Sequence, residues 1–457
     1  MASRHPKGLY VLFFTEMWER FGFYLLGALF VQYLTLHLKM SKAEATHIQG
    51  LYLMSVYLTP FVGGVFADRV YGYTRAVLTG AALLAAGYLL FAIQNKMAFY
   101  ASLGLLVLGN GLFKPNISTL VGNLYPQGDA RRDSAFSIFY MGINIGALFS
   151  GPVGETMRTY FGWPLAFATA GVGMVLSMLI FAAFRRMVTV ADRRSSIGAI
   201  LDVELPAEYE DRDPPEVERA RIAALAIMCF IVMFFWMAFH QNVSTLTFWA
   251  LENTQRVLTV GSWTWEIPPG WFQAANSLFI IILTPVLVRI FGMLRKRNLE
   301  PSTPAKIGLG MVFTALSYAL MVAASLAGGN TGRVSMWWLI GCYFIITIAE
   351  LFLSPMGLSM VTKLAPRRMT AMLMGIWFIA TSAGNYLSGF LGRFWEPWPH
   401  SKFFSLLVVS SLAAAGLLAT QYRRLKAAMP PEGPPEGESS QPPPAAASEE
   451  VATAAPA

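Results

Sequence analysis

Long apolar runs separated by short polar segments dominate the chain. Each run approaches or exceeds about 20 residues, the length that an α-helix needs to cross a bilayer. The runs predict six membrane helices in each half of the chain. The first set lies near residues 9–38, 47–70, 75–94, 98–124, 133–157 and 162–184. The second set lies near residues 221–250, 268–293, 305–327, 335–363, 368–392 and 402–424.

The polar stretches predict the domain organisation. A charged stretch indicates a cytoplasmic linker over 191–219, between a six-helix bundle at 1–190 and a second at 220–426. Residues 427–457 are rich in Pro, Ala and Glu and cannot bury a core, so we expect a disordered cytoplasmic tail. Two sets of six helices around a linker resemble the major facilitator fold, an all-α membrane fold that binds substrate near the bilayer midplane.

The composition supports a membrane protein, and the lack of catalytic motifs argues against an enzyme. Hydrophobic residues make up 55% of the chain and charged residues 13%, whereas soluble domains carry about 25% charged residues. Cys229 and Cys342 fall in separate apolar runs, so we expect buried hydrophobic residues and no disulfide. The sequence shows no metal-ligand cluster, nucleophile elbow or phosphate loop, so we expect no metal, no cofactor and no enzymatic activity.

Ser41 and Glu44 form a capping-box pattern at the start of the second helix.

Basic residues are distributed unevenly between the two sets of connections. Most of them lie in the segments on the same side as the N-terminus, including the pairs at 131–132, 185–186 and 423–424. The positive-inside rule therefore predicts that both termini are cytoplasmic. The same distribution accounts for the pI of 9.4 without a nucleic-acid partner.

Ionisable residues occur inside the first predicted helix. Glu16, Glu19 and Arg20 interrupt its apolar run, and each costs about 2.5 to 3.5 kcal/mol at a helix centre. Glu16 lies one turn before the other two residues, so the cluster forms one face with an internal ion pair. Such residues normally face a bundle interior or a wet cavity, and they mark a transport or proton pathway.

Charged residues at similar depth occur in other helices. At 1.5 Å per residue, Arg20 and Lys114 both lie roughly 15 Å from the cytoplasmic ends of their helices, and Glu350 is also near the middle of its helix. Two cations in the first half and one carboxylate in the second suit a ligand that carries both charges. A free peptide of two or three residues is such a ligand, and it spans about 7 to 10 Å.

Four ordered motifs carry a resemblance to a known family. The stretch Glu16–Tyr24 resembles the ExxERFxYY signature of the proton-coupled oligopeptide transporters, with Phe23 in place of the first tyrosine. The segments at 111–116, 139–146 and 350–366 are similar to this family's segments in helices four, five and ten. The resemblance implies a bacterial inner-membrane protein, active as a monomer, that moves di- and tripeptides together with protons.

The resemblance also implies residue roles. Arg20 and Lys114 would bind the peptide carboxylate, and Glu350 would bind the amino terminus. Asn144 and Asn276 would hydrogen-bond the peptide. The remaining substrate-binding residues would line side-chain pockets, namely Tyr24, Tyr57, Trp236, Ser354 and Trp377.

Proton coupling would use Glu16 and Glu19, because protonation of one carboxylate would release Arg20 for substrate. Burial favours the neutral form of a carboxylate, whereas a neighbouring cation favours the charged form. This competition can link a proton to a peptide.

The loop between helices two and three resembles the gating motif of the facilitator superfamily. Asp68 and Arg69 follow Gly64 and precede Gly72 and Arg75. An aspartate there can pair with a neighbouring helix end, and the glycines permit a tight turn. The alternative is an ordinary charged loop that follows the positive-inside rule.

Two departures from the family pattern change the expectations. His240 stands where the family usually carries an acid before glutamine, and Gly27 stands where many bacterial members carry an arginine. Histidine can accept a proton near neutral pH, so we predict that His240 takes part in outer-gate protonation. An interhelical hydrogen bond is the alternative for His240. The linker is also too short for the two extra helices of many relatives, so we expect twelve spans.

The sequence therefore supports proton-coupled symport of di- and tripeptides by alternating access. The alternative is a transporter of the same fold for nitrate, an amino acid or a peptide-like drug, and a substrate without an amino terminus would not need Glu350. Trp236, Trp377, Tyr57 and Ser354 could also serve only as packing residues, since aromatic and small polar groups are common in bundle cores.

Overall fold

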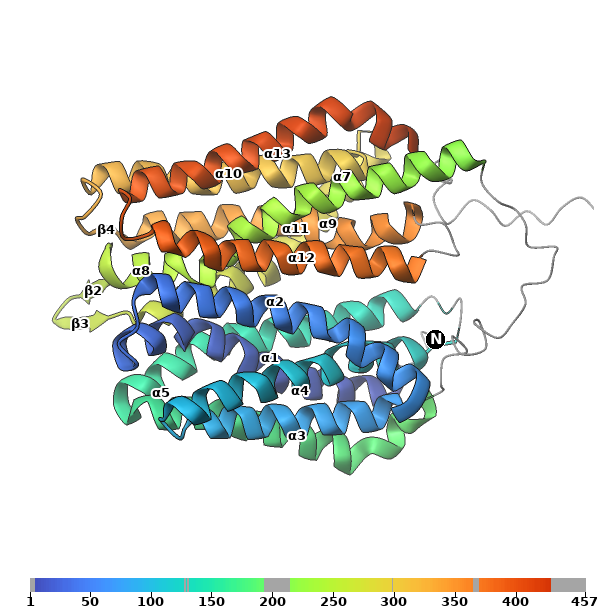
Figure 1. The fold of residues 1–457 in the computed structure, drawn as a ribbon, viewed down its shortest axis with the longest axis horizontal. Coiled ribbons are helices and arrows are strands. Elements are labelled where there is room, and N and C mark those ends of the chain that lie inside the picture. The colour runs from blue at the N-terminus through green and yellow to red at the C-terminus, as the bar shows by residue number, and fades with distance from the viewer. Residues whose placement is uncertain are drawn as a thin grey trace, which may run out of the picture.

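The computed structural model describes residues 5–126, 129, 131–192, 214–297, 299–364 and 370–428. Most of the predicted linker and nearly all of the predicted tail lie outside these ranges. The described chain forms long helices that run side by side (Figure 1).

The first half contains six helical segments. One helix, α5, holds two of them, because Gly162 (φ 83°) breaks its helical backbone. The elements are α1 (Lys7–Gln32), η1 (Tyr33–His37), α2 (Lys42–Phe66), η2 (Ala67–Tyr71), α3 (Tyr73–Phe91), α4 (Lys96–Asn123), α5 (Arg131–Phe184), η3 (Arg185–Met187) and η4 (Thr189–Ala191).

The second half also contains six helical segments, the first of which is divided by a short 3₁₀ turn. The helices are α7 (Pro215–Phe239), η6 (His240–Val243), α8 (Thr245–Glu252), η7 (Pro269–Trp271), α9 (Ala274–Lys296), α10 (Thr303–Ala327), α11 (Met336–Leu364), α12 (Thr370–Leu391), η9 (Gly392–Phe394) and α13 (His400–Ala428). Four short strands are present: β1 (Thr254–Gln255), β2 (Val257–Val260), β3 (Trp263–Glu266) and β4 (Val334–Ser335).

This architecture confirms the expected all-α membrane fold with twelve segments in two bundles. Within the described residues, nine helices are long and apolar enough to span a membrane, and α5 counts among them only once. Ser41 caps α2 as predicted: its hydroxyl accepts the Glu44 N–H, and the Glu44 carboxylate accepts the Ser41 N–H. Cys229 and Cys342 are free and buried, also as predicted.

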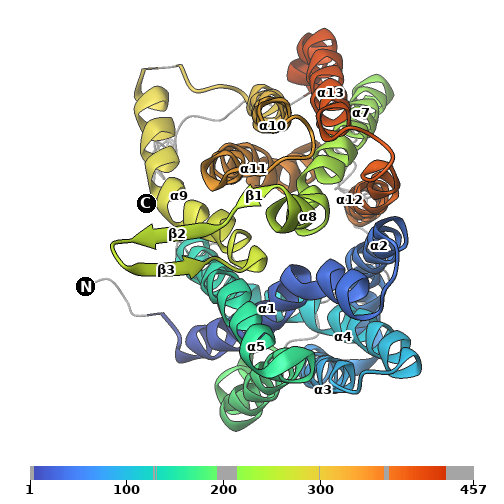
Figure 2. The ribbon, with the colours of Figure 1, turned by 90° about the vertical axis from the view of Figure 1, so that its left-hand side faces the viewer.

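Each half has its own hydrophobic core. One core is built almost entirely from α1–α5 and the other from α7–α13, and the two bundles lie against each other in the end view (Figure 2). The contact between them runs through α2 with α12 and through α5 with α9. A site between the bundles is therefore lined by both halves of the chain.

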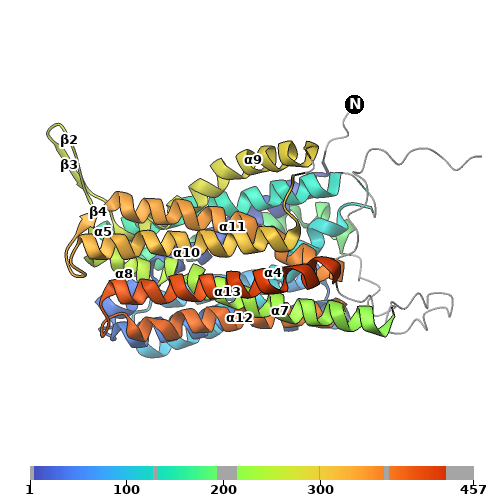
Figure 3. The ribbon, with the colours of Figure 1, turned by 90° about the horizontal axis from the view of Figure 1, so that it is seen from above.

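The two ends of the molecule differ. We call the end that carries β2 and β3 the hairpin end; these strands pair antiparallel and project beyond the helices (Figure 3). The opposite end, where α1 and α7 begin, is the N-terminal end (Figure 1). At the hairpin end α2 and α12 cross closely. A Cβ on Gly50 would lie only 2.8 Å from the Gly389 Cα. Glycine at this crossing lets the two backbones touch.

Three features differ from the predicted boundaries. The seventh helix begins at Pro215, inside the predicted linker, because proline at the first turn followed by Glu216 and Glu218 is a favourable helix start. The expected continuous helix over 221–250 is interrupted by η6. The segment between this helix and the next, for which the sequence analysis made no prediction, forms the β2–β3 hairpin.

Candidate functional site

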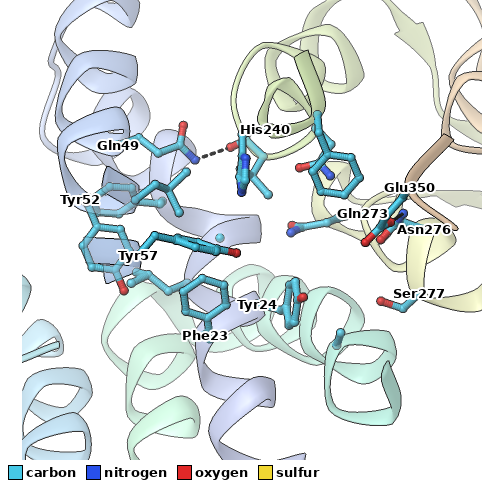
Figure 4. Close-up of a pocket in the computed structure, with 18 residues that line it drawn as sticks. Phe23, Tyr24, Gln49, Tyr52, Tyr57, His240, Gln273, Asn276, Ser277 and Glu350 are labelled. Carbon is cyan, nitrogen blue, oxygen red and sulfur yellow. Dashed lines mark hydrogen bonds between the residues drawn. The ribbon is translucent and has the colours of Figure 1, made fainter. Parts of the chain in front are cut away.

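A cavity lies between the two bundles (Figure 4). Its walls come from α1, α2 and α5 in the first half and from α7, η6, α9 and α11 in the second. The lining residues are Phe23, Tyr24, Leu26, Gly27, Phe30, Gln49, Tyr52, Leu53, Tyr57, Ala147, Phe239, His240, Asn242, Val243, Gln273, Asn276, Ser277 and Glu350. Five of the predicted site residues are among them: Tyr24, Tyr57, His240, Asn276 and Glu350.

The predicted charge cluster of α1 is fully assembled. The Arg20 Nε lies 3.2 Å from the Glu16 Oε1, and it also donates to the Glu19 Oε2. Asn110 reaches Glu19 from α4, with 3.5 Å between its Nδ2 and the Glu19 Oε1. All four side chains are buried, so the cluster is a desolvated network with one cation between two carboxylates.

Arg20 is held away from the cavity surface in this conformation. Its Cζ lies 4.8 Å from the centre of the Phe23 ring, and Phe23 is a cavity-lining residue. The Arg20 Nη2 is buried without a hydrogen-bond partner. The guanidinium therefore keeps one donor unused while both glutamates hold its Nε.

Lys114 reaches the cavity wall through an aromatic ring. Its Nζ lies 4.7 Å from the centre of the Tyr57 ring, within the range of a cation–π interaction. No carboxylate of the described residues lies within 4 Å of it. The first half thus supplies an ammonium group that has an aromatic neighbour and no counter-ion.

Glu350 faces the cavity from the second half and has only neutral polar contacts. Asn276 donates its Nδ2 to the Glu350 Oε2 at 3.0 Å and to the Thr347 Oγ1 at 2.9 Å. Among the side chains that the structure describes, no cation lies within 4 Å of this carboxylate. Glu350 is therefore available to a cationic ligand group.

His240 is the first residue of η6, where the seventh span changes from α-helix to a 3₁₀ turn. Its Nδ1 lies 3.1 Å from the Trp236 carbonyl oxygen, so the Nδ1 carries the proton of a neutral ring and the Nε2 can accept one. The ring centre lies 5.9 Å from that of Tyr57 and 5.4 Å from that of Trp236. These contacts connect His240 to the ring beneath Lys114.

Several predicted site residues lie away from the cavity lining. Asn144 is buried and donates its Nδ2 to the Tyr140 carbonyl oxygen at 3.0 Å, one turn before the lining residue Ala147. Trp377 is buried in the second core, and Trp236 packs against that core. The side chain of Ser354 lies outside the described residues. Asp68 and Arg69 lie on η2, and the Arg69 side chain is exposed.

The cavity also contains polar residues that the sequence analysis did not identify. Gln49 donates its Nε2 to the Val243 carbonyl oxygen across the two halves at 2.6 Å. Gln273 and Asn242 line the cavity from the second half. Their only sequence signal is a polar residue at the end of an apolar run, which is also normal for interfacial residues.

Glu155 was likewise missed. This buried carboxylate of α5 accepts hydrogen bonds from Gln32, from the Arg158 Nε at 2.7 Å and from the Gly270 N–H at 2.9 Å. Gly270 belongs to the second half, so Glu155 joins the two bundles at the hairpin end. The nearby ion pair of Lys42 and Glu252 at 2.6 Å does the same at the surface.

Comparisons with known proteins agree with the fold. The peptide transporter YePEPT of Yersinia enterocolitica is 34% identical over 85% of this chain and 88% of its own length. The dipeptide and tripeptide permease A of Escherichia coli is 30% identical over 85% of this chain and 84% of its own. A crystal structure of a mutant peptide transporter POT in complex with alafosfalin superposes with a TM-score of 0.84 at 34% identity, covering 93% of this chain and 96% of that one.

A family model leads to the same conclusion. The model for PTR2, the POT family, matches residues 74–205 and 211–402. This match covers most of both bundles, and the alignments with the two relatives cover most of each relative's length. The chain is a multi-pass membrane transporter and not an enzyme, and it belongs to the POT family.

Proposed function

We propose that the chain carries di- and tripeptides into the cell together with protons by alternating access. One observation carries this proposal: Lys114 and Glu350 approach the same cavity from opposite halves, and neither has an ion-pair partner among the described residues. A charge withdrawn from water without a partner is costly. A ligand with a carboxylate at one end and an ammonium at the other would satisfy both groups.

Each end of the peptide then has a defined partner. Lys114 and the unused Nη2 of Arg20 would bind the carboxylate, and Glu350, oriented by Asn276, would bind the amino terminus. Tyr24 and Tyr57 would form the walls between these groups. Because Asn144, Trp236, Ser354 and Trp377 are not among the cavity-lining residues, we propose that they contact peptide in other conformations of the transport cycle.

Proton coupling would act through the α1 cluster. Protonation of Glu16 or Glu19 would remove one of the charges that hold Arg20, so the guanidinium could turn towards a peptide carboxylate. His240 would receive a proton at the Nε2 and would face Lys114 across Tyr57. The proton gradient would supply the energy, and the cycle would need no cofactor.

The charge distribution supports one orientation. We propose that the hairpin end faces outward and that both termini are cytoplasmic in the bacterial inner membrane, because most basic loop residues lie at the N-terminal end. The direct contacts between the halves at the hairpin end would close the outer side. Asp68 and Arg69 on η2 would then belong to the inner gate. The proposed unit is a monomer, with one cavity between its own two bundles.

Uptake of labelled dialanine into proteoliposomes would test the proposal. With an inward proton gradient, wild-type protein should accumulate peptide, and an ionophore that collapses the gradient should abolish accumulation. Glu350→Gln keeps the shape but removes the charge for the amino terminus, so uptake should fall by about 10- to 100-fold, as expected for a charge-assisted hydrogen bond. Folded wild-type protein that does not accumulate dialanine would contradict the proposal and favour nitrate, an amino acid or a peptide-like drug.

A further inference from the structure

We propose that the hairpin end of the cavity is a subsite for the first side chain of the peptide and that Gln273 selects neutral, hydrogen-bonding side chains there. We call this part of the cavity the amide recess, and we define it by Gly27, Gln49, Asn242 and Gln273. The assignment rests on the proposed peptide transport, and it adds a specificity that the charges at the two peptide ends do not provide.

Gln273 carries an amide whose hydrogen-bonding capacity is unused. The residue is the N-cap of α9, and its side chain points into the cavity (Figure 4). Its Oε1 is buried without a partner. The described residues also offer its Nε2 no hydrogen bond. Gln273 itself is half-buried, but a buried amide oxygen is normally satisfied, so this unused acceptor points to a ligand.

Gly27 creates the space in front of this amide. A Cβ on Gly27 would lie 3.4 Å from the Gln273 Nε2 and 3.6 Å from the Val243 Cγ1. Gln273 therefore reaches from the second half to the surface of α1, where Gly27 presents no side chain to it. Any side chain longer than alanine at position 27 would fill this space.

The remaining polar groups of the recess are also neutral. Gln49 and Asn242 are buried, and each has a side-chain oxygen without a hydrogen-bond partner. Leu26, Phe30 and Leu53 supply apolar surface around them. Unpaired amide oxygens in an apolar surround favour a ligand side chain that donates hydrogen bonds, and they offer no counter-ion to a charged one.

The position of Gln273 assigns the recess to the first residue of the peptide. Gln273 lies three residues before Asn276, which is one helical turn, and Asn276 is bonded to Glu350. An amino terminus on Glu350 places the first side chain close to this turn of α9. Lys114 approaches the cavity at Tyr57, which is not part of the recess, so carboxylate binding there leaves the recess free.

A matched pair of peptides tests this assignment. Asparagine and leucine have nearly the same shape, so asparaginyl-alanine and leucyl-alanine are compared as competitors of labelled dialanine uptake. We expect wild-type protein to bind the asparaginyl peptide about ten-fold more tightly, which corresponds to about 1.4 kcal/mol. In Gln273→Met, which keeps the length of the side chain, the ratio of the two inhibition constants should fall to about one.

A control and a second variant complete the experiment. Leu278→Met changes an exposed residue of the same helix and should leave the ratio unchanged. Gly27→Leu should weaken both peptides at least ten-fold relative to glycyl-alanine, because it fills the recess. A wild-type ratio near one, or a ratio that survives in Gln273→Met, would overturn the assignment. Folded wild-type protein without dialanine uptake would overturn the proposed function, and with it the assignment of the recess as a peptide subsite.

Discussion

The two walls of the cavity handle charge in opposite ways. In the first half, Arg20 lies between Glu16 and Glu19 in a buried network, and its Nε is committed to both carboxylates. In the second half, Glu350 has only Asn276 as a polar side-chain partner among the described residues, and amides and an imidazole line the same cavity.

This difference separates two tasks. Groups that neutralise one another can exchange partners when one proton is added, so the first wall is suited to switching. A carboxylate with only a neutral partner gains most from a ligand cation, so the second wall is suited to recognition. The comparison therefore predicts that mutations in the α1 cluster of the first wall damage coupling, whereas mutations in the second wall, like those of the unpaired Lys114, alter affinity and selectivity.

The largest expected effect comes from removing the cation of the first wall. Arg20→Gln leaves two buried carboxylates without a counter-ion, and breaking a buried pair in this way costs about 3 to 5 kcal/mol. Proton-driven uptake of dialanine should fall to background. Arg20→Lys is the matched control, because it retains the charge, and it should keep part of the activity. Equal loss in both variants would contradict a role for the charge itself.

The junction between the walls provides the next test. Glu155→Gln removes a charge that accepts the Gly270 N–H, so the hairpin end should open about ten-fold more often, since hydrogen bonds to charged groups contribute about 1.5 to 3 kcal/mol. Spin labels at the exposed positions Tyr160 and Trp337 would report this change as a longer distance population in a background without the native cysteines. An unchanged distance distribution would show that Glu155 does not hold the halves together.

His240 tests whether the second wall is free of coupling groups. If its imidazole accepts a proton from outside, His240→Ala should reduce gradient-driven accumulation several-fold while peptide exchange across the membrane without a gradient continues. His240→Gln keeps a hydrogen-bonding group that does not titrate, and it should show the same defect. Unchanged proton-driven uptake in His240→Ala would assign the histidine a packing role only.

The smallest effect is expected for an ion pair outside the membrane-spanning segments. Hydrogen bonds from Arg295 and Lys306 lower the pKa of Glu300 to about 2. Because the folded-state pKa is depressed, the stabilisation is present above the ordinary carboxyl pKa and is lost as the pH falls towards 2. Glu300→Gln should cost about 1 kcal/mol at pH 7, because the pair with Arg295 is solvent-exposed and weak whereas Lys306 is buried.

Thermal unfolding in detergent would measure this effect. The difference between wild type and Glu300→Gln should shrink when the pH is lowered from 7 towards 2. A difference that grows on acidification would contradict the sign of the pKa shift. The loss of stability in Glu300→Gln can also be compared with the loss on removing a charge from the buried network of the first wall.

Much of the fold and part of the site followed from the sequence. The apolar runs predicted the spans because a bilayer demands long uninterrupted helices, and the charged residues within them were conspicuous. Glu16, Glu19 and Arg20 do form one cluster. The predicted roles of the site residues remain predictions until the variants above are measured.

Other features depend on contacts between distant segments. Glu155 is a single acid near a helix end in the sequence, and only the approach of Gly270 from the other half makes it a bridge. The side chain of Gln273 has open space beside it only because Gly27, which is far away along the chain, has no side chain. The hairpin over 257–266 could have been found, since alternating Val-Leu-Thr-Val and Trp-Thr-Trp-Glu around a Gly-Ser turn is typical of paired strands.

The bridges at the hairpin end differ in how easily a mutation removes the group that each half contributes. Gln49 and Glu155 contribute side chains from the first half, but their partners in the second half are the Val243 carbonyl oxygen and the Gly270 N–H. A carbonyl oxygen survives nearly every substitution of its own residue, so the Val243 partner is robust. Gly270 is not, because a Cβ there would lie 2.6 Å from the Glu155 Cγ and proline would also remove the N–H. The second half can therefore vary in sequence at Val243 while that bridge persists, whereas a single codon change at Gln49, Glu155 or Gly270 disturbs a bridge.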